Sequence, residues 1–271
     1  MKKLLIAIVF GALCLPAARG AQVDTLAVPS HAMNREVTVV AIRPDKAVAG
    51  EKCPVIYLLH GYSGDAFSWM KLKPELPQIA DREGIIFICP DGENSWYWDS
   101  PLDKDYRYET FVAKELVEYV DRNFATRADR LGRAVTGLSM GGHGGMWLGI
   151  RHKETFGAAG SMSGGLDIRP FPDNWEMKLQ LGEQAANREL WERHTAINQL
   201  DGLRDGELAI IIDCGSGDFF LAVNEAFHKK LLEKGIGHDF TVRPGKHDNR
   251  YWNNAIDYQV LFFKKFFDTP R

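Results

Sequence analysis

Four short, continuous runs of apolar residues limit how this chain can fold more than any other feature of its sequence. The runs occupy residues 54–59, 85–89, 134–136 and 208–212, and each is rich in Val, Ile, Leu or Ala without alternating polar positions. Strands buried on both faces have this pattern, and they belong to parallel sheets that helices cover on both sides. The runs therefore predict a mostly parallel sheet.

Helical patterns complete this prediction of the fold. Apolar residues recur every three or four positions in two stripes, and a third such stripe covers residues 251–267. The first two stripes are Val112, Leu116, Val120 and Phe124, and Phe220, Val223, Phe227 and Leu231. Strands that alternate with amphipathic helices indicate a doubly wound α/β sheet. The earlier segments 23–28 and 35–42 are rich in β-branched residues and partly alternate, so they predict an antiparallel N-terminal edge.

The N-terminus is typical of an export signal. Lys2 and Lys3 precede an apolar run over residues 4–15, and Pro16 and a small-residue stretch follow it. The run is shorter than the roughly 20 residues that span a bilayer. We therefore expect a signal peptide over residues 1–21, a secreted or periplasmic protein, and no stable membrane insertion after cleavage. Residues 22–271 are long enough for one domain with a sizeable core.

Charge and composition exclude several kinds of partner and cofactor. The formal net charge is −3, so the chain lacks the basic surface that nucleic-acid binding requires. No His-Glu-x-x-His or comparable spacing occurs, and we expect neither a metal nor an organic cofactor. Beyond the signal, Cys53, Cys89 and Cys214 are too few for a disulfide framework, and we expect three buried thiols.

The motif Gly137-Leu-Ser-Met-Gly141 is the strongest chemical signal. It follows the apolar run 134–136 and opens a helical stretch, the setting in which a sharp turn exposes a nucleophilic serine. A phosphate-binding loop is excluded because no Lys follows the glycines. Ser139 is therefore the candidate nucleophile, and the backbone N–H of Met140 is one candidate donor to an oxyanion.

A serine nucleophile needs a basic histidine and an acid that orients it. His247 follows the apparent strand 239–243 and precedes the last helix, so it is the candidate base. Asp213 ends the preceding apolar run, over residues 208–213, and Asp218 lies in the loop that follows it. Asp218 is the preferred acid because two glycines let this loop fold back toward the site. The order Ser…Asp…His is that of α/β-hydrolases. Asp248 is a weak candidate because it adjoins the histidine.

The second oxyanion donor is expected in the glycine-rich loop after the run 54–59. This loop reads His60-Gly-Tyr-Ser-Gly64, and the N–H of Tyr62 is the candidate. His60 is a candidate substrate contact in the same loop. Each such donor contributes about 10²- to 10³-fold in turnover.

Four motifs in order resemble the esterase D-like family of α/β-hydrolases. They are Leu-Leu-His-Gly-Tyr-Ser-Gly (58–64), Gly-Leu-Ser-Met-Gly-Gly-His-Gly (137–144), Asp-Cys-Gly-Ser-Gly-Asp-Phe (213–219) and Gly-Lys-His-Asp-Asn-Arg-Tyr-Trp (245–252). The resemblance covers nearly the whole chain after the signal. It implies an α/β-hydrolase fold, a triad of Ser139, Asp218 and His247, and oxyanion donors at Met140 and Tyr62. Asn249 departs from the Trp that many members carry after His-Asp.

Two aromatic segments each permit two interpretations. Residues 167–208 are polar and helix-prone, and this insertion is either a cap beside the active site or a surface excursion whose tryptophans only pack. In the loop 92–99, Trp96 and Trp98 are candidates for stacking on a sugar or phenolic group, or they pack against the insertion.

These observations predict a secreted serine carboxylesterase that hydrolyses short-chain or carbohydrate-linked esters, of acetyl or feruloyl type, through an acyl-enzyme. The substrate would be a small-molecule or oligosaccharide ester. The alternatives are a general short-chain (tributyrin-type) esterase, an S-formylglutathione hydrolase-like thioesterase, an acyltransferase, or an inactive carbohydrate-binding relative. The resemblance is to a family that includes each of these enzyme types, and the sequence does not indicate an oligomeric state.

Overall fold

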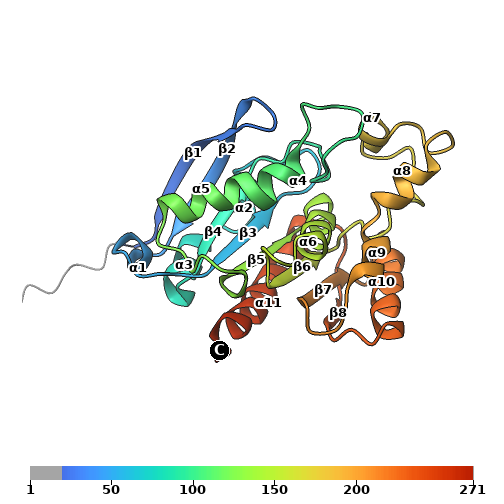
Figure 1. The fold of residues 1–271 in the computed structure, drawn as a ribbon. Coiled ribbons are helices and arrows are strands. Elements are labelled where there is room, and N and C mark those ends of the chain that lie inside the picture. Colours follow the sequence, from blue (N-terminus) through green and yellow to red (C-terminus); the bar gives the residue numbers. More distant parts are fainter. Residues whose placement is uncertain (1–19, 271) are drawn as a thin grey trace, which may run out of the picture.

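The structure is a computed structural model that describes residues 20–270. All of the expected signal peptide except Gly20 and Ala21 lies outside the described residues, so that prediction is not tested here. One eight-stranded sheet runs through the described part, in the order β1-β2-β4-β3-β5-β6-β7-β8 (Figure 1). The strands are β1 (Gln22–Ser30), β2 (Arg35–Arg43), β3 (Val55–Leu59), β4 (Ile86–Pro90), β5 (Arg133–Gly137), β6 (Ala158–Met162), β7 (Ala209–Gly215) and β8 (Asp239–Arg243).

Strand direction agrees with the sequence patterns. β1 pairs with β2, and β2 with β4, in antiparallel register, whereas every later pair from β4 to β8 is parallel. The antiparallel edge therefore comes from the two half-exposed N-terminal segments. The buried parallel strands come from the continuous apolar runs, because both of their faces pack against other elements.

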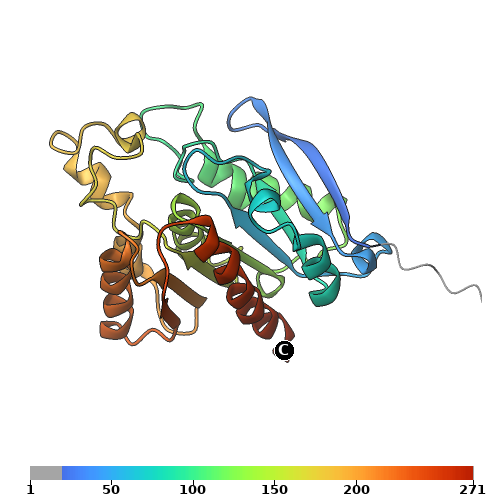
Figure 2. The same ribbon diagram turned by 180° about the vertical axis from the view of Figure 1, so that it is seen from behind.

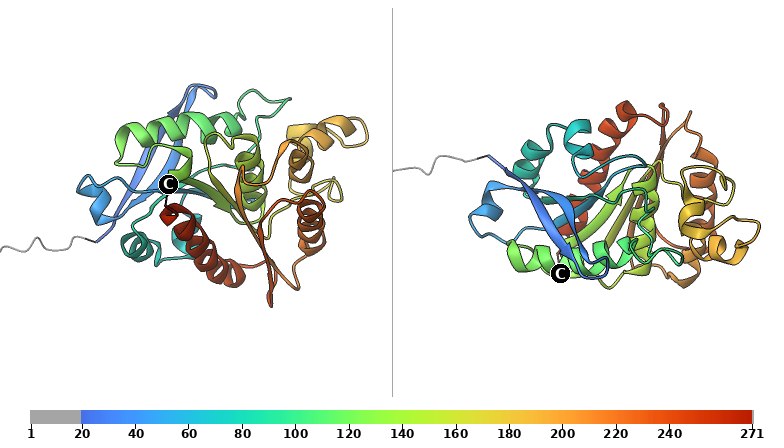
Figure 3. Two further views of the ribbon diagram at one scale, coloured as in Figure 1. Left: turned by 60° about the horizontal axis from the view of Figure 1, so that its bottom comes forward. Right: turned by 90° about the horizontal axis from the view of Figure 1, so that it is seen from above.

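Helices cover both faces of the sheet. α5 (Leu116–Asn123), α6 (Met140–Arg151) and α10 (Leu221–Glu233) pack on one face, where side chains such as Val55 and Tyr57 form one core. α3 (Leu76–Glu83) and α11 (Asn249–Asp268) pack on the other face, where Ile56 and Leu58 contribute to a second core. Figures 1, 2 and 3 show α5 and α11 on opposite sides of the strands. Successive strand residues point to opposite faces, so each strand supplies both cores.

The three predicted helical stripes are all helical. The stripe at 112–124 becomes α4 (Tyr108–Thr110), a π-helical segment η1 (Phe111–Glu115) and α5, the second becomes α10, and the C-terminal stripe becomes α11. The remaining helices on the way to the insertion are short: α1 (Asp45–Val48), α2 (Ser68–Leu72) and the 3-10 segment η2 (Arg130–Gly132). No helix among residues 20–270 combines the length and the apolar character needed to cross a membrane.

The insertion between β6 and β7 carries three short helices, α7 (Met177–Leu181), α8 (Arg188–Arg193) and α9 (Ala196–Gln199), followed by the 3-10 segment η3 (Leu200–Gly202). Figure 1 shows α7 and α8 at the end of the molecule remote from β1 and β2. Trp191 is fully buried, and its Nε1 donates to Gly182 O at 2.9 Å, so this tryptophan anchors the insertion internally. Cys53, Cys89 and Cys214 are free and buried, as the sequence predicts.

Candidate active site

Ser139 lies in the sharp turn between β5 and α6. Its φ of 54° and ψ of −116° place a non-glycine residue in the left-handed half of conformational space, which is strained by about 1–3 kcal/mol. A Cβ on Gly137 would lie 2.5 Å from Leu59 O, and one on Gly141 would lie 2.4 Å from the same oxygen. Only glycine permits this approach of the turn to the end of β3. The turn therefore holds Ser139 at the carboxyl edge of the central strands.

His247 and Asp218 complete a chain of hydrogen bonds with Ser139. His247 Nε2 lies 2.8 Å from Ser139 Oγ, and His247 Nδ1 lies 2.9 Å and 3.0 Å from the two carboxylate oxygens of Asp218. An ionised carboxylate only accepts hydrogen bonds, so Nδ1 carries the proton and donates to Asp218. Nε2 is then an acceptor for the Ser139 hydroxyl. This tautomer is the one that a general base requires.

Asp213, within β7, and Asp218, in the loop after it, have different partners. Asp218 sits in the loop after β7 with its side chain fully buried, and its Oδ1 also accepts the N–H of Phe220 at 2.8 Å. Asp213 instead accepts the hydroxyl of Tyr251 at 2.5 Å and forms an ion pair with Arg243. The structure therefore brings Asp218, and not Asp213, to the imidazole.

Asp248, the third acid near the histidine, also lies away from the imidazole contact. Its side chain accepts the N–H of Tyr251 at 2.9 Å and caps the start of α11.

Aromatic rings surround the imidazole. The ring centroid of Phe219 lies 4.2 Å from that of His247, and Trp252 meets the imidazole edge-on at 4.8 Å. The His247 side chain retains 14% of its exposure. These apolar rings lower the local dielectric constant, and they therefore strengthen the hydrogen bonds that link Ser139, His247 and Asp218.

The candidate oxyanion donors are the backbone N–H groups of Tyr62 and Met140. The loop between β3 and α2 approaches so closely that a Cβ on Gly61 would lie 3.4 Å from Ser139 Cβ. Among residues 20–270, no hydrogen-bond acceptor faces the N–H of Tyr62 in this loop or the N–H of Met140 at the start of α6. Both donors are therefore available to an oxygen bound next to Ser139.

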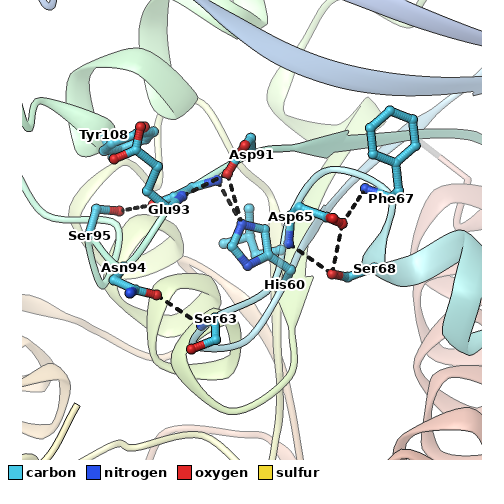
Figure 4. A network of polar contacts seen from close by, with 12 residues as sticks. His60, Ser63, Asp65, Phe67, Ser68, Asp91, Glu93, Asn94, Ser95 and Tyr108 are labelled. Carbon is cyan, nitrogen blue, oxygen red and sulfur yellow. Dashed lines mark hydrogen bonds and ion pairs between the residues drawn. The ribbon is translucent and has the colours of Figure 1, made fainter.

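His60 corrects one sequence-based interpretation. The side chain is only 1% exposed and does not line the cleft at Ser139, so it is not a substrate contact. Its Nδ1 lies 2.7 Å from Gly61 O and its Nε2 accepts the N–H of Gly92 at 2.7 Å. Figure 4 shows the ring beside Asp91, below the end of β4. His60 therefore holds the loop 60–64, which carries the candidate oxyanion donor Tyr62, against the loop after β4.

Trp96 and Trp98 correct a second interpretation. They are 1% and 0% exposed and do not line the cleft, so neither ring is available to stack on a substrate. The two indoles stack on each other at 5.7 Å and enclose His143, which is fully buried. Burial lowers the pKa of His143 to about 3, so its imidazole is neutral at physiological pH. Of the two interpretations of this loop, packing against the insertion is correct.

The open space at Ser139 is a cleft of about 500 Å³. One wall is aromatic and consists of Trp175 from the insertion, Phe219 and Trp252. Polar side chains, among them Ser68, Lys71 and Asn249, also line the cleft. Sequence reasoning did not assign this aromatic wall to the substrate. Phe219 directly follows Asp218 and Trp252 follows His247 on α11, and this proximity was the signal available.

Glu109 behaves as a structural acid. Its carboxylate accepts hydrogen bonds from Trp147 Nε1, Arg151 Nε and His152 Nε2, all within 2.9 Å. Burial raises its pKa, but the contacts with His152 and Arg151 outweigh burial and hold the pKa below the usual value. In the part of the chain that the structure describes, no three His, Cys, Asp or Glu side chains converge as a metal site would require.

Comparison with known proteins identifies similar chains. The family model described as "Putative esterase" matches residues 30–263. An acetyl esterase of Caldicellulosiruptor saccharolyticus is 25% identical over 250 residues, which cover 84% of this chain and 92% of that one. An S-formylglutathione hydrolase of Bos taurus is 28% identical, with coverage of 77% and 80%. A diacylglycerol acyltransferase/mycolyltransferase of Mycobacterium leprae is 34% identical, with coverage of 88% and 81%.

Two solved structures share the fold. A fluorophosphonate-binding serine hydrolase of Staphylococcus aureus superposes with a TM-score of 0.82 at 21% identity, and 91% of this chain covers 99% of that one. A ferulic acid esterase superposes with a TM-score of 0.75 at 28% identity, with coverage of 91% and 98%. The predicted α/β-hydrolase fold, with its parallel sheet and antiparallel edge, is thereby confirmed.

Proposed function

This chain belongs to the esterase family and is a carboxylic ester hydrolase, and from that premise we propose that it cleaves short-chain or carbohydrate-linked esters outside the cytoplasm, with Ser139 as nucleophile. The observation that carries the proposal is the continuous hydrogen-bond chain from Asp218 through His247 to Ser139. The series of hydrogen bonds ends at the cleft that contains Ser139. The backbone N–H groups of Tyr62 and Met140 have no hydrogen-bond partner among residues 20–270 and are the candidate oxyanion donors.

The reaction proceeds by acyl transfer to the serine. His247 Nε2 takes the hydroxyl proton as Ser139 Oγ attacks the ester carbonyl, and Asp218 stabilises the imidazolium that forms. The N–H groups of Tyr62 and Met140 donate to the oxyanion of the tetrahedral intermediate. The imidazolium then gives its proton to the leaving alcohol. A water molecule, deprotonated by the same Nε2, attacks the acyl carbon. The bond from Ser139 Oγ to that carbon then breaks, the acid leaves, and His247 returns the proton to Ser139 Oγ.

The cleft walls support a small or flat acyl group. Trp175 and Phe219 stack within 20° of parallel at 5.8 Å and both border the cleft, so they present flat apolar surface next to the nucleophile. Phe219 is 53% exposed, which leaves this surface free to contact a ligand. Acetyl and phenolic acyl groups both fit such a wall, because rigid aromatic side chains bind apolar groups with little loss of conformational freedom. The similarity to an acetyl esterase and to a ferulic acid esterase supports these two acyl classes.

Transfer of the acyl group to an acceptor other than water is the second candidate function. The similarity to an enzyme named as an acyltransferase favours it. Both functions use the same acyl-enzyme, and they differ in which hydroxyl attacks it.

Labelling and product analysis test the proposal. The protein that begins at Gln22 should react with a fluorophosphonate at Ser139, identified by peptide mass, and should hydrolyse p-nitrophenyl acetate. Hydrolysis predicts free acetate as the product in the presence of excess xylotriose, whereas transfer predicts acetylated xylotriose. Expression of the full chain in a bacterial host should yield the shortened protein in the periplasm or medium. Retention of the full-length protein in the cytoplasm would contradict export, and labelling at another residue would contradict the nucleophile.

A further inference from the structure

The first residues that the structure describes are held by a carboxylate from a distant element. The backbone N–H of Ala21 donates to Asp81 Oδ2 at 2.6 Å, and 60 residues separate the two. Ala21 is half-buried and packs against the second core, whereas Gly20, one residue earlier, is exposed. β1 then begins at Gln22, which pairs with Arg43 of β2. Within residues 20–270, the packed part of the chain therefore begins at Ala21.

Asp81 carries a negative charge that no cationic side chain among residues 20–270 neutralises. It lies in α3, and its Oδ1 accepts the N–H of Asp45, the first residue of α1, at 2.8 Å. Its hydrogen bonds among these residues thus come from two backbone N–H groups, one at each carboxylate oxygen. Figures 1 and 2 show the start of β1 beside α1 and α3. An ammonium group at the position of Ala21 N would form a stronger, charge-assisted hydrogen bond than an amide does.

The sequence before Ala21 independently marks a cleavage point. A signal sequence ends with small residues at the cleaved position and two positions before it. Gly20 and Ala18 have this spacing for a cut between Gly20 and Ala21. A cut after Ala21 would place Arg19 two positions before it, and a cut after Ala18 would place Pro16 there. The spacing therefore favours a signal that ends at Gly20, one residue earlier than the boundary expected above.

We propose that the chain is cut between Gly20 and Ala21 and that the new α-ammonium group of Ala21 forms an ion pair with Asp81. The inference rests on the proposed function, since it requires that the protein is exported. A signal peptidase hydrolyses the peptide bond with one water molecule, so the released segment ends in the Gly20 carboxylate and the mature chain begins with the Ala21 amino group. An α-amino group has an ordinary pKa of about 7.7–8.0, so it is mostly protonated at pH 7.

Mass analysis of the exported protein tests the cleavage point. Expression of the full chain in a bacterial host should yield a protein whose N-terminal peptide begins with Ala21. Gly20→Leu places a bulky residue at the cut and should lower the fraction that begins at Ala21 roughly ten-fold. Arg19→Leu brings the same side chain to the position between the two small residues and should leave that fraction unchanged. Equal fractions for the two variants, or a wild-type protein that begins at another residue, would overturn the proposal.

Titration of the exported protein tests the ion pair. The pKa of the Ala21 amino group, followed by competitive acetylation and mass analysis, should lie above about 7.7–8.0 in the wild type and within that range in Asp81→Asn. Glu75→Gln is the matched control, because it removes the same charge from an exposed position at the start of α3. It should leave the pKa at the wild-type value. A pKa that Asp81→Asn does not change would overturn the proposal.

Stability gives a second readout with a defined pH dependence. Selective acetylation of the Ala21 amino group should lower Tm at pH 7 by about 1–3 °C, a small shift because Asp81 is exposed, and should not change the Tm of Asp81→Asn. Pairing raises the pKa of the amino group in the folded protein. Its stabilisation is therefore complete below the unfolded pKa of about 7.7–8.0 and is lost as the pH rises through the folded pKa. An equal loss of Tm in the wild type and Asp81→Asn would contradict the ion pair.

Failure of export has a different signature. If the full-length chain stays in the cytoplasm with its signal, the proposed export is wrong and so is this inference. If the protein is exported but begins at another residue, export stands and only the cut after Gly20 and the ion pair with Asp81 are wrong. Hydrolysis of p-nitrophenyl acetate tests the esterase mechanism separately from both.

Discussion

His247 Nε2 lies 2.8 Å from Ser139 Oγ, although 108 residues separate the two in the chain. The parallel sheet accounts for this contact. Ser139 follows β5, and His247 follows β8, so both leave the carboxyl edge of the same sheet. Loops at that edge converge in open α/β sheets, and they can differ in sequence without disturbing the strands.

Removal of the nucleophile should abolish turnover without unfolding the protein. In Ser139→Ala, kcat for p-nitrophenyl acetate should fall by roughly 10⁴- to 10⁶-fold, because binding and the oxyanion donors alone remain. The strained φ of 54° persists in the variant, so its thermal midpoint should stay close to that of the wild type. Turnover within ten-fold of the wild type would exclude Ser139 as the nucleophile.

Substitution of Asp213, in β7, and of Asp218, in the loop after β7, should have different effects. Asp218→Asn should reduce kcat about 10⁴-fold, because an amide no longer fixes the Nδ1–H tautomer of His247. Asp213→Asn should instead lower the free energy of unfolding by about 3 kcal/mol, because it removes the buried carboxylate that pairs with the partly buried Arg243 guanidinium.

Kinetics on the folded fraction and urea unfolding of each variant separate these two effects. A larger loss of kcat in folded Asp213→Asn than in folded Asp218→Asn would reverse the assignment of the orienting acid.

The strands and the three side chains of the hydrogen-bond chain could be anticipated because each depends on local signals. Apolar runs identify the strands, and loops at their carboxyl ends identify Ser139, Asp218 and His247 as neighbours at one edge. The choice of Asp218 over Asp213 also had a local basis, because two glycines precede it. The geometry agrees with that choice, and the catalytic roles await the variants above.

The environment of the tryptophans could not be anticipated, because burial of a loop depends on distant segments. Trp96 Nε1 donates to Trp175 O at 3.4 Å, and 79 residues separate the two. An aromatic loop has the same sequence whether the insertion covers it or leaves it exposed. His60 illustrates the same limit: its position after β3 was clear, but its hydrogen bonds to Gly61 and Gly92 depend on the loop after β4.

Glu109 should contribute stability that depends on pH. Its pKa is held below the usual value in the folded protein, so its contribution is complete above its unfolded pKa of about 4.3 and is lost as the pH falls through the lower folded pKa. Glu109→Gln should therefore reduce the free energy of unfolding at pH 7 by about 1–3 kcal/mol, a range that allows for the partial exposure of Arg151.

Urea unfolding of the wild type and Glu109→Gln at several pH values measures this dependence. The difference between the two proteins should shrink between pH 4 and lower values. A difference that grows as the pH falls would contradict the direction of the pKa shift.

The aromatic wall should distinguish flat acyl groups from small ones. Phe219→Ala removes the exposed ring beside His247, and methyl ferulate should then show a KM several-fold higher, because a stacked aromatic pair contributes about 0.5–1.5 kcal/mol. p-Nitrophenyl acetate has an acetyl group too small to cover that ring, so the ratio of kcat/KM for methyl ferulate to kcat/KM for this ester should fall. Trp98→Ala is the matched comparison: it empties a fully buried site, so it should destabilise the fold by about 3–5 kcal/mol and leave that ratio unchanged in the folded fraction. An equal fall of the ratio in both variants would mean that the buried tryptophans, and not the wall at Phe219, select the acyl group.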